Sequence, residues 1–87
     1  MLREQKAEAQ QALDELFSKH LLPFKLSARE VESIGLEEHI VRFHDSRLPS
    51  VDVSWPKGEC FKDVFRTAIL ERVKRLSGSQ RAGRLTR

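Results

Sequence analysis

The chain has 87 residues, a single cysteine and a formal net charge of +3. This length fits one small domain and leaves no room for a second hydrophobic core. A lone cysteine excludes a disulfide within the chain, and a structural zinc would need more ligands than Cys60 and three scattered histidines supply. We therefore expect oligomerisation to be an additional source of stability.

The N-terminal stretch is too polar for a signal peptide, and the apolar runs are too short to span a membrane. A single cysteine favours a reducing compartment. We expect a cytoplasmic protein that does not enter a membrane.

The first predicted element is a helix over residues 3–21, where small and apolar side chains recur at helical spacing. Pro23 ends it, because the residue before a proline avoids the helical region. The first two turns carry few apolar side chains, so this part either frays or packs against a partner chain.

Residues 24–35 fit two interpretations. Phe24, Leu26 and Ala28 alternate as in a strand, but the same alternation would then bury two glutamates. Alternatively, a short helix begins after Ser27 and stops at Gly35. We favour the short helix for residues 27–34.

Residues 37–44 and 51–55 alternate between apolar and polar side chains and predict two strands. Phe43 and Trp55 fall on the inward faces. The connection is a loop of turn-favouring residues, so the strands are expected to form an antiparallel hairpin.

A second helix is predicted over residues 59–77, with Gly78 as its stop. Arg72 interrupts the apolar face near the end, where it could extend to solvent or pair with an acid. Leu70 lies on the opposite, charged face. It is either an ordinary exposed leucine or part of a second contact surface, such as a dimer interface.

Basic residues concentrate in the last third of the chain. Residues 1–58 contain eight Lys/Arg against ten Asp/Glu, whereas residues 59–87 contain eight against three. We expect a single domain over residues 1–78 and a disordered basic tail over residues 79–87. The tail carries the candidates for nucleic-acid binding, which are Arg81, Arg84 and Arg87.

These elements predict a two-layer α+β fold. An antiparallel β-hairpin, or a three-stranded meander if residues 24–34 form a strand, packs against the N- and C-terminal helices. The expected core consists of Leu13, Leu16, Phe17, Leu26, Val41, Phe43, Val51, Val53, Trp55, Phe61, Val64, Phe65, Ala68 and Ile69.

No arrangement of residues predicts catalysis. Cys60 lies at a helix start and could combine with His44 and Asp45, but the sequence supplies no oxyanion donor. His39 and His44 are an odd number of residues apart on a strand and point to opposite faces, so they cannot share a metal. We expect no enzyme, no metal and no cofactor.

With a strand at residues 24–34, the order helix–three strands–helix is similar to that of double-stranded RNA-binding domains. Those domains carry a lysine-rich segment at the start of the second helix. Here that segment is GECFKDVF, with two acids and one lysine. The similarity therefore extends to the order of elements and not to the phosphate-binding residues.

The leading hypothesis is a small non-enzymatic interaction module that self-associates as a homodimer. Alternatives are a nucleic-acid-binding domain, a Cys60-dependent enzyme and a binder of small apolar ligands. Asp45 and Arg47 either stabilise their own turn or contact a partner. The candidate interaction residues are Arg42, His44, Asp45, Arg47, Leu48 and Leu70.

Overall fold

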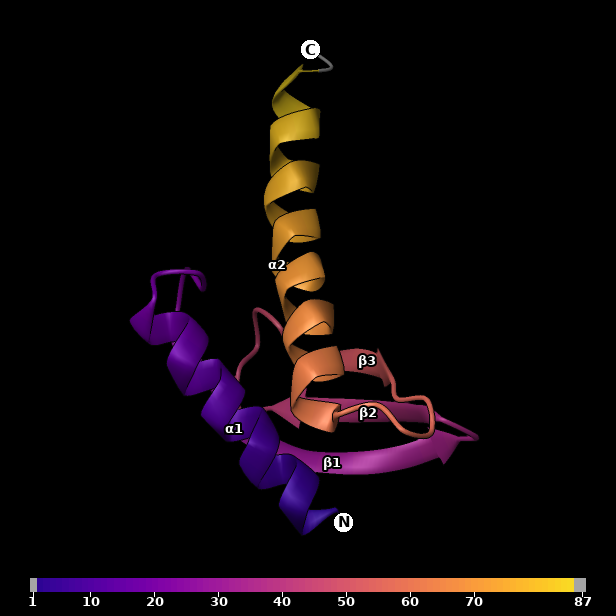
Figure 1. Cartoon of the computed structure of the whole chain (residues 1–87). Helices are drawn as coiled ribbons and strands as arrows, with labels where there is room; N and C mark the ends of the chain where they lie inside the picture. The colour runs from indigo at the N-terminus through magenta and orange to yellow at the C-terminus, as the bar shows by residue number, and fades with distance from the viewer. Residues whose placement is uncertain (1, 86–87) are drawn as a thin grey trace.

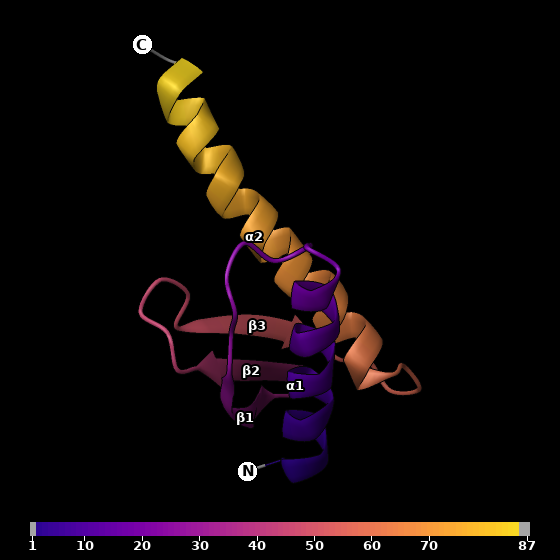
Figure 2. The same cartoon turned by 90° about the vertical axis from the view of Figure 1, so that its left-hand side faces the viewer.

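The computed structural model describes residues 2–85, with side chains described through residue 76. Its elements, in chain order, are α1 (Arg3–Ser18), β1 (Ala28–Gly35), β2 (Glu38–Phe43), β3 (Ser50–Ser54) and α2 (Phe61–Leu85). The strands form one antiparallel sheet in the order β1-β2-β3, and both helices lie on one face of it (Figures 1 and 2). The predicted two-layer α+β fold is confirmed, in its three-stranded form.

β1 is a strand, so the short helix predicted for residues 27–34 is wrong. Ala28 pairs with Phe43 and Glu30 pairs with Arg42, which leaves Arg29 as an additional residue in β1. Such a β-bulge shifts the alternation of side chains by one position. Ala28 and Val31 are therefore both buried. The glutamates that argued against a strand lie on the outer face instead.

The inward faces of β2 and β3 are largely as predicted. Val41, Phe43, Val51 and Val53 are buried, while Trp55 is half-buried and packs against the core. Val64 and Ala68 of the predicted core are likewise only partly buried.

Two predictions for the core and its margins are wrong. Phe17 is 40% exposed, because α1 ends at Ser18 and the backbone turns sharply at His20, where φ is 62°. Leu48 was expected on the exposed loop but is fully buried.

α2 crosses the edge of β3, and its second half projects beyond the sheet (Figures 1 and 2). Its 25 residues correspond to a length of about 37 Å, comparable with the 44 Å long dimension of the molecule. The helix continues through Gly78, where the sequence predicted its end. The domain boundary at residue 78 and the disorder of residues 79–87 stay predictions.

Within the described residues, no helix is long and apolar enough to cross a membrane. Leu70 is half-buried and packs against the core. It is therefore not an isolated exposed leucine, and its place in a dimer interface stays a prediction.

Candidate functional site

The reactive side chains of residues 39–60 lie apart. His39 is 8% exposed, and its ring centroid is 5.2 Å from that of Trp55. His44 is exposed, which confirms that the two histidines point to opposite faces. Within the described residues, no group of three His, Cys, Asp or Glu side chains could hold a metal ion.

Cys60 is exposed and free, and its carbonyl oxygen accepts the first hydrogen bonds of α2. His44 follows the C-terminal end of β2. Cys60 lies near the other end of β2. It comes shortly after Trp55, whose backbone N–H donates to the carbonyl of Glu37, the residue just before β2. The two side chains therefore lie toward opposite ends of β2, whose six residues span about 20 Å. This distance excludes direct activation of Cys60 by His44.

The loop after β2 is closed by its own charged residues. The Arg47 guanidinium donates to both Asp45 carboxylate oxygens, at 3.1 and 2.7 Å, and lies 4.0 Å from the Phe24 ring centroid. These hydrogen bonds lower the pKa of Asp45 to about 2. Leu48 anchors the loop in the core. Asp45 and Arg47 therefore stabilise their turn, and Leu48 is not available to a partner.

Arg42 is engaged on the outer face of the sheet. Its guanidinium contacts Glu30 at 3.0 Å and Glu32 at 2.9 Å. The hydrogen bond from Arg42 lowers the pKa of Glu32. A cross-strand pair of this kind accounts for Arg42 within the fold.

The free edge of β3 is the most distinctive open surface. Phe43 N–H donates to the Pro49 carbonyl, and Trp55 N–H donates to the Glu37 carbonyl. In an antiparallel ladder the bonded residues alternate, so positions 49, 51, 53 and 55 face β2. The backbone groups of Ser50, Asp52 and Ser54 consequently point to the free edge, where no hydrogen bond to another described element satisfies them.

Two neighbouring cavities lie between β3 and α2, where the helix crosses this edge. One has a volume of about 340 Å³, the other about 470 Å³, and both are lined by Asp52, Ala68 and Glu71. The first also contains Arg72 and Arg75. The second is lined by further acidic and small residues, among them Glu59, Asp63 and Thr67.

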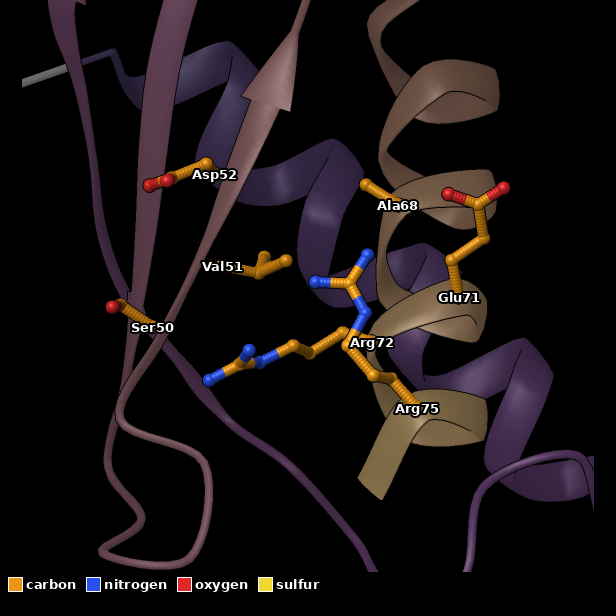
Figure 3. Close-up of a pocket in the computed structure, with 7 residues that line it drawn as sticks. All are labelled: Ser50, Val51, Asp52, Ala68, Glu71, Arg72 and Arg75. Atoms are coloured by element: carbon orange, nitrogen blue, oxygen red, sulfur yellow. The ribbon is translucent and has the colours of Figure 1, made fainter. Parts of the chain in front are cut away.

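Figure 3 shows the Arg72 and Arg75 side chains extending from α2 toward β3. Neither arginine forms an ion pair with any side chain that the structure describes. The Nε atom of Arg72 is buried and has no hydrogen-bond partner among them. We call the cavity lined by Ser50, Arg72 and Arg75 the basic pocket.

Sequence reasoning did not select these two arginines as a site. The available signal was the position of Arg72 within the apolar face of its helix. Of the two possibilities for Arg72, pairing with an acid is not found among the described side chains, and Arg75 lies one turn further along. Both arginines face the open edge of β3 because of where α2 crosses the sheet. The pattern of apolar residues in a helix does not determine this crossing.

Several large apolar side chains are exposed at two other places. Leu36 and Ile34, at the turn between β1 and β2, are 94% and 56% exposed. Leu21 and Phe17, at the end of α1, are 52% and 40% exposed.

The nucleic-acid candidates Arg81, Arg84 and Arg87 lie outside the described side chains. At the start of α2, the lone lysine, Lys62, donates to Glu15 at 2.8 Å. Comparison with models of known protein families, with curated proteins and with solved structures found no match to this chain.

Proposed function

We propose that the protein is a small non-enzymatic interaction module that adds an extended segment of a partner chain to the free edge of β3. The unpaired backbone groups of Ser50, Asp52 and Ser54 carry this proposal. A partner strand satisfies such groups with main-chain hydrogen bonds, and pockets beside the edge select its side chains.

Apart from the crossing of α2 (Figure 2), the edge lacks the usual protection against strand addition. Natural edge strands are commonly blocked by proline, lysine, a bulge or a covering element. β3 has the sequence SVDVS, with neither proline nor lysine, and its pairing with β2 is regular. The two register shifts of this sheet, after Ala28 and after Ser33, both lie in β1, at the opposite edge.

The direct test is selection from a displayed library of random peptides about eight residues long, enough to span the edge. We expect Asp52→Pro to lose the selected peptides, because proline removes the N–H at the centre of the free edge. The ladder with β2 does not use this N–H. Selection of no peptide, or equal binding by a folded Asp52→Pro variant, would exclude strand addition at β3.

We further propose that the module self-associates as a homodimer through its exposed apolar side chains. Exposed large apolar side chains such as Ile34 and Leu36 favour association, and a second copy supplies a matching surface. Sedimentation at micromolar concentration should show a dimer that Leu36→Asp with Ile34→Asp shifts toward monomer. A wild-type chain that remains monomeric would contradict this part of the proposal.

Two finer expectations belong to the same proposal. A cytoplasmic location is supported by the use of a single cysteine. The absence of enzymatic activity is supported by the separation of Cys60 from His44.

A further inference from the structure

We infer that the basic pocket is a carboxylate-binding site that receives an Asp or Glu side chain of the strand added to β3. The inference rests on the proposed function, because the pocket lies at the Ser50 end of the same edge. It adds the chemistry of the partner, which is an extended segment with an acidic residue at a fixed position.

The pocket offers hydrogen-bond donors, and the carboxylates that line it do not pair with them. Arg72 and Arg75 contribute guanidinium groups, and the backbone N–H groups of the edge lie beside them. The Ser50 hydroxyl, on the same face of β3 as Asp52, points away from α2 in Figure 3. Asp52 and Glu71 also line the pocket, but in Figure 3 the Asp52 carboxylate points away from α2 and that of Glu71 points away from β3. Neither carboxylate pairs with a guanidinium there.

Arg72 lacks a carboxylate partner among the described side chains, and its Nε, like Nδ1 of His39, is buried without a hydrogen-bond partner there. A buried donor without an acceptor destabilises the folded chain relative to one that is bonded. A carboxylate accepts two parallel hydrogen bonds from the two terminal N–H groups of a guanidinium. With a volume of about 340 Å³, the pocket has room for an Asp or Glu side chain.

The position of the pocket favours a carboxylate on a peptide over a phosphate. An added strand lies about 4.8 Å from β3, and its alternate side chains point toward the helix-covered face. One of them reaches the pocket beside Ser50. The neighbouring cavity, toward the Ser54 end of the edge, is lined by Glu59 and Asp63. An acidic side chain is therefore accepted at the Ser50 end of the edge and repelled at the other. This difference also fixes the direction of the segment.

The test uses a library-selected peptide that contains Glu or Asp, synthesised in versions with Glu, Gln or phosphoserine at that position. Binding to the full chain is measured by fluorescence polarisation. We expect Glu→Gln in the peptide to weaken binding about tenfold or more, as for loss of a charge-assisted hydrogen bond. Arg75→Gln and Arg72→Lys in the protein should reduce this preference for Glu, while Lys74→Gln, an exposed neighbour on α2, should retain it.

The outcomes separate the two proposals. If Asp52→Pro abolishes binding but Glu and Gln peptides bind equally, strand addition stands and the carboxylate site is excluded. A library that yields peptides without enriched acidic residues excludes it as well. Much tighter binding of the phosphoserine peptide would identify a phosphate site instead. Arg72→Lys keeps the positive charge but not the bidentate geometry, so the test does not depend on a variant that unfolds.

Discussion

The arginines of this protein fall into two regions with opposite surroundings. Arg42 and Arg47, on β2 and in the loop that follows, each contact carboxylates of their own chain. Arg72 and Arg75, on α2, have no such partner among the described side chains. The comparison shows that charge alone does not identify an interaction surface. The informative charged residues are those that the fold leaves unpaired.

The largest expected effect on stability tests whether the loop that contains Arg47 is anchored in the folded core by Leu48. Leu48 is fully buried, so Leu48→Ala should lower the free energy of unfolding by about 2–5 kcal/mol, as for other buried leucines. The matched control is Leu21→Ala, which removes an exposed side chain and should change it by about 0.5 kcal/mol or less. Urea denaturation measures both, and similar values for the two variants would contradict the assignment.

A smaller effect compares the two kinds of arginine directly. Arg42→Gln removes the contacts to Glu30 and Glu32 and should lower the urea midpoint slightly, by less than Leu48→Ala does. The loss should shrink at about 1 M salt, where the Debye length is about 3 Å. Arg75→Gln should leave the midpoint unchanged, because no internal ion pair is lost. A larger destabilisation by Arg75→Gln than by Arg42→Gln would contradict the distinction between paired and unpaired arginines.

The smallest effect concerns the pH dependence of the loop. Hydrogen bonds from Arg47 lower the pKa of Asp45 from 3.8 to about 2 in the folded chain. The contribution of Asp45 to stability is therefore fully present above the unfolded pKa and is lost as the pH falls through about 2. NMR titration of the Asp45 carboxyl should give this low midpoint, and Arg47→Gln should return it toward 3.8. An unshifted midpoint in the wild-type chain would show that the pair does not form.

Much of the fold could be predicted from the sequence, because local periodicity determines it. β2, β3 and the beginning of α2 follow from side-chain alternation and helical spacing. At β1 the sequence fits both a strand and a short helix, because the additional residue Arg29 shifts the alternation of side chains and the same residues match a helix start. Leu48 was misplaced because the burial of a loop residue depends on where the loop folds back, which is a tertiary property.

The candidate site was predictable only in part. The sequence indicated the charge asymmetry and the unusual position of Arg72. The interaction residues predicted from it, however, lie mainly in the loop where Arg47 pairs with Asp45. The open edge of β3 follows from strand order, and the basic pocket follows from the crossing of α2 over that edge. Both depend on packing between segments distant in the chain.

The most direct test is amide hydrogen exchange at β3, free and with a library-selected peptide. In the free chain, Ser50, Asp52 and Ser54 should exchange faster than Val51 and Val53, whose N–H groups face β2. Saturation with the peptide should slow exchange at the three edge positions by about tenfold or more, as their N–H groups gain partners. Unchanged exchange at these positions in the saturated complex would contradict strand addition at β3.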